Sequence, residues 1–305
     1  MPDLVLKKDL ENAGDGEGML AMKSWKRRLR KWRNRIARRI LSTRAGREML
    51  VNAISPRVLT MTADCGDHLM TFSPHDYIGR KIYRKGHFER ENVDRLLAIL
   101  RQRNLLKQDA VLLELGGNIG TQTLYFALSK AFRHIVTVEP DPRNYRLLKT
   151  NIDQNAMGDR ITAINSAAGE NEGALDFFLH RDNHGKSSAL RQSDRDIAIT
   201  VPVKPVTAIL AEAAIAPEEI GLIWMDIEGY EPVAARSMQP LLERRVPFYM
   251  EFSPVFYGPD GSKAFIDHLA QFYTNCIVFF EDRQVEMKVT AMPADIEQFD
   301  VLLLP

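Results

Sequence analysis

The stretch ELGGNIG at residues 114–120 decides the fold of this chain. An apolar run at 110–115 leads into its glycines, and a helical segment at 121–130 follows them. Glycines at a turn between a strand and a helix let the backbone approach a ligand closely. The stretch therefore predicts a strand, a glycine-rich turn and a helix that together can hold a ligand.

Apolar runs and helical segments alternate along the chain around this turn. Two short strands are expected at 57–63 and 68–72, and helices at 91–101 and 142–155. Further strands are expected at 134–138, 161–164, 222–225, 246–250, 276–280 and 300–304. Such alternation is typical of a mostly parallel sheet covered by helices on both faces, with room for an antiparallel hairpin at the end.

Glu139 ends the second strand of this alternation, nineteen residues after Gly120. A carboxylate at this place can accept hydrogen bonds from both ribose hydroxyls of a nucleoside. Dinucleotide sites usually show G-x-G-x-x-G around a pyrophosphate, whereas these glycines follow the acidic Glu114. Because a carboxylate repels pyrophosphate and suits an ammonium group, the pattern favours S-adenosylmethionine over NAD.

Several separated motifs together resemble the FkbM family of methyltransferases. They are ELGGNIG at 114–120, VEPDP at 138–142, Asn144, Asn151, Asn155, Ser187-Ser188 and MDIEGYE at 225–231. They occur in order over roughly residues 80–255, and Tyr83, Gly86, Phe88 and Glu89 resemble the segment that precedes the cofactor turn. The family usually has Asp in place of Glu114 and Ala in place of Gly117, and Gly117 would let the backbone adjust to the longer carboxylate.

The resemblance implies a Rossmann-like class I methyltransferase fold with a seven-stranded, mostly parallel sheet and an N-terminal helical extension. It also implies S-adenosylmethionine as the cofactor. The implied cofactor-binding residues are Glu89, Glu114, Gly116, Gly117, Asn118, Gly120, Glu139, Pro140, Ser166, Ala167 and Asp226. In this scheme the residues of the glycine turn surround the methionine part, Glu139 holds the ribose, and Pro140, Ser166 and Ala167 lie on the adenine side.

Three side chains are candidates for the base that removes the proton of an acceptor: Asp226, His184 and Glu251. Asp226 ends the strand at 222–225 and points into the crevice, unless it caps the following helix. His184 lies in a polar loop that could close over the acceptor, or it is an inert surface residue. Glu251 ends a strand at the same edge, or only bonds Ser253. Glu228 is either functional or a solvated charge.

The resemblance implies a hydroxyl acceptor on a sugar, a glycolipid or a secondary metabolite. Methylation of nitrogen or carbon in a small molecule is the alternative, and a non-catalytic S-adenosylmethionine-binding scaffold is another. Asp226 and Glu251 could clamp a diol through Mg²⁺, but the sequence offers no third oxygen ligand, so we expect no metal. Nucleic-acid methyltransferases commonly carry Asn or Asp followed by Pro-Pro and an aromatic where this chain has Asp226-Ile-Glu-Gly.

Residues 21–50 are strongly basic, with three lysines and nine arginines against the single Glu48, although the formal net charge of the chain is only +1. The apolar residues Trp25, Leu29, Trp32, Ile36 and Ile40 recur there at spacings of three and four. This pattern predicts a cationic amphipathic helix. Its apolar stripe could pack on the chain's own domain or on an anionic membrane through residues 23–47, and nucleic acid is the least supported partner.

Composition and the order of the predicted elements suggest three parts of the chain. These are a disordered tail and basic helix at 1–50, a strand and helix subdomain at 51–109, and a methyltransferase domain at 110–305. Residues 1–20 are the expected disordered tail. Cys65 and Cys276 are far apart and match no metal or redox spacing, which suits a reducing cytoplasm. We expect a cytoplasmic protein, with any peripheral membrane contact at the inner face.

Overall fold

The computed structural model describes residues 25, 27–181 and 183–305, and the chain divides into two compact units between Ser55 and Pro56. The predicted disordered tail at 1–20 lies outside the described residues. In the first unit residues 27–41 are helical, and α2 (Arg44–Asn52) follows with Thr43 as its N-cap. Within the described ranges, no helix is both long and apolar enough to cross a membrane.

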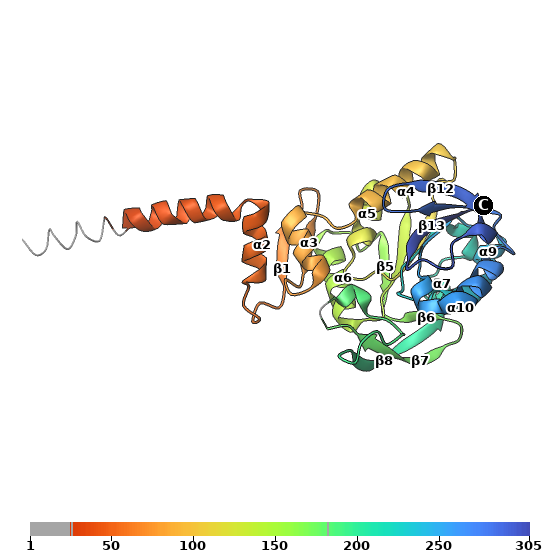
Figure 1. Cartoon of the computed structure of the whole chain (residues 1–305). Coiled ribbons are helices and arrows are strands. Elements are labelled where there is room, and N and C mark those ends of the chain that lie inside the picture. Colours follow the sequence, from red (N-terminus) through yellow and green to blue (C-terminus); the bar gives the residue numbers. More distant parts are fainter. Residues whose placement is uncertain (1–24, 26, 182) are drawn as a thin grey trace, which may run out of the picture. The chain divides into compact units, whose positions relative to one another are not determined.

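The second unit contains the segment 56–109 together with the predicted methyltransferase domain (Figure 1). Its strands are β1 (Met61–Asp64), β2 (Leu69–Phe72), β3 (Val111–Leu115), β4 (His134–Val138), β5 (Ile161–Ile164), β6 (Ala167–Gly169), β7 (Gly173–Leu179), β8 (Ile197–Pro205), β9 (Ile220–Met225), β10 (Phe248–Phe252), β11 (Asn275–Phe279), β12 (Gln284–Lys288) and β13 (Phe299–Leu304). Its helices are α3 (Tyr77–Lys85), α4 (Arg90–Gln102), α5 (Thr121–Ser129), α6 (Pro142–Gln154), α7 (Val206–Glu212), α8 (Glu231–Arg236), α9 (Gln239–Glu243) and α10 (Pro254–Leu269). Three short 3₁₀ turns are η1 (His184–Lys186), η2 (Pro217–Glu219) and η3 (Val289–Ala291).

The main sheet has the strand order β12-β11-β13-β10-β9-β3-β4-β5. Strands β10, β9, β3, β4 and β5 run parallel, whereas β13, β11 and β12 pair in antiparallel fashion. The predicted helix-covered, mostly parallel sheet is confirmed. It has eight strands rather than seven because β12 alternates between exposed and half-buried residues and therefore shows no apolar run in the sequence.

Alternation along the central strands builds two separate cores. Val111, Leu113 and Leu115 of β3 pack on one face with α7, α8, α9 and α10. Leu112 of the same strand packs on the opposite face with α4, α5 and α6. Successive side chains of a strand point to opposite faces, so each strand contributes to both cores. Burial on both faces explains why these strands read as continuous apolar runs.

The chain reverses its direction of winding at β3. It continues from β3 to β4 and β5 on one side, and later adds β9 and β10 on the other side. The connections at the carboxyl ends of β3 and β9 therefore diverge and leave a crevice between them. The glycine turn at 116–120 and the segment 226–230 lie at this crevice.

Two smaller sheets flank the main one. Strands β1 and β2 form an antiparallel pair, as the sequence predicted, and β2 is tied to α6 and its C-cap because the N–H groups of Thr71 and Leu69 donate to the side chains of Asn151 and Asn155. Strands β6, β8 and β7 form a three-stranded sheet that no apolar run in the sequence indicated. The connection from β7 to β8 carries the polar loop around His184, so this second sheet positions that loop.

Candidate active site

The glycine turn packs against the ends of β4 and β9, the two strands that flank β3 in the sheet. The amide N–H groups of Gly116 and Gly117 both donate to the carbonyl oxygen of Val138, at 2.9 Å. Gly116 has a φ of +91°, and a Cβ at this position would lie 1.8 Å from the carbonyl oxygen of Asp226. A Cβ on Gly117 would lie 2.2 Å from Oγ1 of Thr137. Only glycine allows the turn to sit this close to both strands.

Glu139 is held in place by backbone donors. Its Oε2 accepts the N–H of Asn118 at 2.7 Å, and its Oε1 accepts the N–H of Asp141 at 2.8 Å. The side chain is buried, and burial together with the Asp141 charge raises the pKa of Glu139 to about 8, against the opposing effect of the two N–H donors. Each carboxylate oxygen keeps a further lone pair for an outside donor. The carboxylate is therefore oriented before any ligand arrives.

Glu114 does not reach the crevice, although the sequence placed it beside the methionine part of a cofactor. Its position in β3 turns the side chain toward α5, where Thr123 Oγ1 donates to its Oε2 at 2.5 Å. The carboxyl group is fully buried, and this burial raises its pKa to about 7. Strand alternation explains why Glu114 points away from the crevice, because its side chain lies on the same face of the sheet as Leu112 and on the opposite face from Leu115.

A cleft of about 230 Å³ opens at the carboxyl ends of the parallel strands. It brings together most of the predicted site residues, namely Glu89, Gly116, Asn118, Glu139, Pro140, His184, Asp226, Glu228 and Glu251. Ser166 and Ala167 line a small adjoining cavity, to which Gly116 and Pro140 also contribute. Gly117 and Gly120 line neither cavity and shape the turn from behind.

Three carboxylates gather at one end of the cleft. One oxygen each of Asp226, Glu228 and Glu251 lies within 4.8 Å of the others. Burial first, and then the neighbouring carboxylates, raise the pKa of Glu228 to about 8 and that of Glu251 to about 9. Burial and Glu228 raise the pKa of Asp226 well above its ordinary value. This carboxylate cluster therefore retains protons at neutral pH, because like charges in a desolvated site cannot all ionise.

The segment 226–231 is fixed by its last residue rather than by Asp226. The buried Glu231 accepts the N–H groups of Ile227 at 3.0 Å and Gly229 at 3.3 Å, and the Tyr257 hydroxyl donates to it at 2.6 Å. Helix α8 has Tyr230 at its N-cap position and no side-chain capping bond. Asp226 therefore does not cap this helix, and its carboxylate faces the cleft.

Glu251 has modest partners at the same end of the cleft. Ser253 Oγ donates to its Oε1 at 3.3 Å, as the alternative interpretation of the sequence anticipated, and Gln298 Nε2 donates to its Oε2 at 3.2 Å. Glu89 lies near by on the cleft wall with a φ of 54° and accepts a hydrogen bond from Gln122 at 3.3 Å. Burial, Asp300 and Glu91 raise the pKa of Glu89 to about 7.

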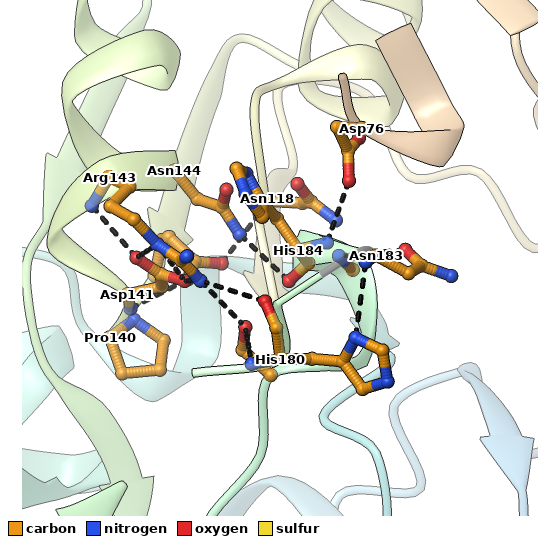
Figure 2. Close-up of polar contacts among 12 residues, drawn as sticks. Asp76, Asn118, Pro140, Asp141, Arg143, Asn144, His180, Asn183 and His184 are labelled. Carbon is orange, nitrogen blue, oxygen red and sulfur yellow. Dashed lines mark hydrogen bonds and ion pairs between the residues drawn. The ribbon is translucent and has the colours of Figure 1, made fainter. Parts of the chain in front are cut away.

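The loop formed by residues 180–181 and 183–188, which we call the lid loop, is tied to the body by the N-cap of α3 and by α6 (Figure 2). Asp76 Oδ1 accepts the His184 N–H at 2.7 Å, and Asn144 Nδ2 donates to the His184 carbonyl at 3.2 Å. Arg143 pairs with Asp141 at 2.7 Å and donates to Ser187 Oγ at 3.3 Å. These bonds hold the backbone around His184 at the wall of the cleft.

Burial lowers the pKa of His184, with Arg143 contributing in the same direction. The ring is therefore neutral at pH 7 and retains a nitrogen that can accept a proton. Its position on the cleft wall keeps it among the candidate bases.

Sequence reasoning gave no role to Asp76, Arg143, Ser188 or Glu231. Ser188 Oγ donates to the carbonyl of Glu228 at 2.6 Å and so joins the lid loop to the carboxylate cluster. Ser188 and Glu231 lie inside motifs that carry the family resemblance. The sequence therefore singled out their positions but did not predict their hydrogen bonds. Asp76 showed only the pattern of a helix N-cap, which it also is.

Comparison with known proteins agrees with this geometry. The family model described as the methyltransferase FkbM domain matches residues 114–276. A curated relative, the 2-O-methyltransferase NoeI of Sinorhizobium fredii, is 28% identical over 188 residues, which is 55% of this chain and 74% of the relative.

Solved structures with a similar fold include a putative O-methyltransferase from Klebsiella pneumoniae, with 13% identity and a TM-score of 0.40 over 70% of this chain and 80% of that one. Another is the SAM-dependent methyltransferase from Agrobacterium tumefaciens, with 10% identity and a TM-score of 0.45 over 83% of this chain and 71% of that one. Because the family model covers more than half of the residues, the chain belongs to the FkbM family of methyltransferases.

Proposed function

We propose that the chain transfers the methyl group of S-adenosylmethionine to a hydroxyl of a sugar, a glycolipid or a secondary metabolite. The observation that carries the proposal is a single cleft with two different ends. At one end Glu139 is oriented by two backbone N–H groups, and at the other the carboxylate cluster faces the same space. The first end suits a ribose, and the second suits a group that must lose a proton.

The residues of the cleft fit S-adenosylmethionine. Gly116 lets the turn pack directly against the carbonyl of Asp226, which places the backbone of the turn at the wall of the cleft. The adjoining small cavity is walled by Ala167, Phe177 and Ile227, a flat apolar setting that suits an adenine ring. Ser166 Oγ is buried there and has no hydrogen-bond partner among the described residues, so it could bond a ring nitrogen.

The bound cofactor would supply a methyl group on a sulfonium, which is a good leaving group for in-line displacement. The protein's main task is to align the acceptor, which can contribute about 7–11 kcal/mol. Within the carboxylate cluster, pKa values raised to about 8 and about 9 keep Glu228 and Glu251 mostly protonated at pH 7, and one member ionises beside a protonated one as the pH rises toward 8. The ionised member can accept the hydroxyl proton of the acceptor.

The charge of the cleft restricts the acceptor. Glu89, Asp226, Glu228 and Glu251 all line it, so the cleft offers a phosphate-bearing or carboxylate-bearing acceptor little attraction while these groups are protonated and repels it once they ionise. Hydroxyl groups can donate to carboxylates, and a sugar presents several of them. The name of the relative from Sinorhizobium fredii points to an oxygen acceptor as well. Methylation of an amine in a small molecule is the alternative, and identification of the methylated atom decides between them.

A metal-assisted variant is favoured by one observation that the sequence did not show. Glu228 provides the third oxygen that was missing beside Asp226 and Glu251. Three carboxylate oxygens are ligands that Mg²⁺ or Ca²⁺ accepts. If a divalent cation clamps the acceptor, EDTA will abolish methyl transfer and Mg²⁺ will restore it, whereas transfer by the carboxylates alone will be insensitive to EDTA.

The first test is calorimetric titration of S-adenosylmethionine, and separately of NAD, into the full chain. We expect only the first to bind, and we expect Glu139→Gln to weaken it at least about tenfold because the neutral amide loses one acceptor oxygen. Glu172→Gln, an exposed residue outside the cleft, is the matched control and should bind as the unchanged chain does.

A screen of sugars, glycolipids and polyols with methyl-labelled cofactor then identifies the acceptor. Binding without transfer to any acceptor would support the scaffold interpretation. Failure of S-adenosylmethionine to bind would contradict the proposal.

A further inference from the structure

The helix in the first unit has an apolar face and a strongly basic face, and the two faces require different surroundings. Residue 25 and residues 27–41 are helical. Residues 27–41 include eight arginines and lysines and no acidic residue. Its apolar residues are Trp25, Leu29, Trp32, Ile36 and Ile40, and their exposed fractions lie between 40% and 61%. Large apolar side chains exposed together mark a surface that is covered by something else.

The apolar residues form one continuous stripe. At about 100° per residue, the five positions fall within an arc of roughly 80°. Arg28, Lys31, Arg35 and Arg38 project from the remainder of the cylinder, and all four are exposed. The helix therefore has a narrow apolar face with two tryptophans and a wide cationic face.

We propose that this helix docks the protein on an anionic membrane surface, with Trp25 and Trp32 at the level of the lipid headgroups. A membrane interface satisfies both faces at once, because the stripe enters the apolar boundary while the arginines and lysines meet lipid phosphates. The long basic side chains can extend from the stripe to the headgroups.

Other binding partners would contact only one of the two faces of the helix favourably. Nucleic acid would contact the cationic face and leave the tryptophan stripe in water. A second copy of the helix would cover the stripe, but it would bring two rows of arginines together with no acidic residue between positions 27 and 41 to offset them. The combination of stripe and charge therefore favours a lipid surface.

The test is flotation of the full chain with vesicles of phosphatidylcholine alone and with vesicles that contain 30% phosphatidylglycerol. We expect flotation with the anionic vesicles and little with the neutral ones, and a decline as salt rises. Arg28→Gln, Lys31→Gln, Arg35→Gln and Arg38→Gln combined should lower partitioning at least about a hundredfold. Trp25→Ala with Trp32→Ala should lower it at least about tenfold.

Matched controls remove the same chemistry elsewhere on the surface. Arg101→Gln, Lys107→Gln, Lys263→Gln and Arg283→Gln remove four exposed charges outside the helix, and Leu59→Ala with Val255→Ala shortens two exposed apolar side chains. Both controls should float as the unchanged chain does. Melting curves verify that every variant is folded.

The proposal fails if the chain floats with neither kind of vesicle, or if the helix variants float as well as their controls. It also fails if a 20-base-pair DNA or RNA duplex displaces the chain from anionic vesicles at physiological salt. Binding of that duplex that depends on the four basic residues, but not on the two tryptophans, would identify nucleic acid as the partner.

Discussion

The two ends of the cleft treat their carboxylates in opposite ways. Glu139 is held by two backbone N–H donors at 2.7 and 2.8 Å. Asp226, Glu228 and Glu251 instead face one another within 4.8 Å, with few donors of their own. A carboxylate held by fixed donors orients a ligand, whereas carboxylates that oppose one another hold and release protons or bind a cation. On the proposed function, binding and chemistry are thus separated within one cleft.

The backbone explains this contrast. The cofactor end is built from a glycine turn and the start of a helix, where free N–H groups are available. The other end gathers two residues that follow β9 and one near the end of β10, and because these two parallel strands are neighbours, their acidic side chains converge on one edge of the sheet.

The largest effect is expected at the carboxylate cluster. Glu251→Gln should lower the turnover rate by about 10² to 10⁴, because it removes a group that can take up the acceptor proton. The affinity for S-adenosylmethionine should stay within about twofold of the unchanged chain. Initial rates of labelled methyl transfer and calorimetry measure the two quantities. An equal loss of rate in the exposed-site variant Glu172→Gln would show that the effect is not specific to the cluster.

A smaller effect, on stability, is expected at the glycine turn. Gly117→Ala places a Cβ against Thr137 Oγ1 and should lower the free energy of unfolding by about 1–3 kcal/mol. Thr137→Ala in the same chain should recover part of the loss, because it removes the group that clashes. Gly158→Ala, which meets open space, is the control. Urea unfolding measures these three variants and Thr137→Ala alone, and purely additive losses would show that the two residues do not constrain each other.

A further effect concerns the lid loop. Asn144→Ala removes the hydrogen bond to the His184 carbonyl and should weaken S-adenosylmethionine binding by about two- to tenfold, the effect expected for one hydrogen bond. Asn155→Ala also removes side-chain hydrogen bonds to backbone, but far from the cleft at Leu69, and should leave the affinity unchanged. If both variants bind equally well, the lid loop does not contribute to the cofactor end.

The smallest effect is a dependence of stability on pH. The pKa values of Glu228 and Glu251 are raised to about 8 and about 9, so the folded chain keeps protons that the unfolded chain releases above pH 5. The free energy of unfolding should therefore fall, by an amount on the order of 1 kcal/mol, as pH rises from 5 to 9. Glu251→Gln should flatten this slope in part, because Glu114 and Glu139, whose pKa values are raised to about 7 and about 8, contribute as well. An equal reduction of the slope of the unchanged chain in millimolar Mg²⁺ would show that a cation neutralises the cluster.

Several features followed from the sequence for clear physical reasons. The central strands are buried on both faces and therefore appear as apolar runs. The glycine turn and Glu139 could be identified because one strand, one turn and one helix fix their spacing. The amphipathic helix at 27–41 followed from its periodicity.

Other features depend on contacts between distant segments, which no local pattern records. Strands β7 and β8 alternate between exposed and buried residues and were missed. Strand alternation, together with the packing of α5, turned Glu114 away from the cleft. The joining of Glu228 to Asp226 and Glu251, and of Asp76 and Asn144 to the lid loop, arises only when strands and loops far apart in the chain meet at one edge of the sheet. Local sequence thus determined the central strands and the glycine turn, and tertiary structure decided which side chains share the cleft, because that depends on which distant segments the fold brings to the same sheet edge.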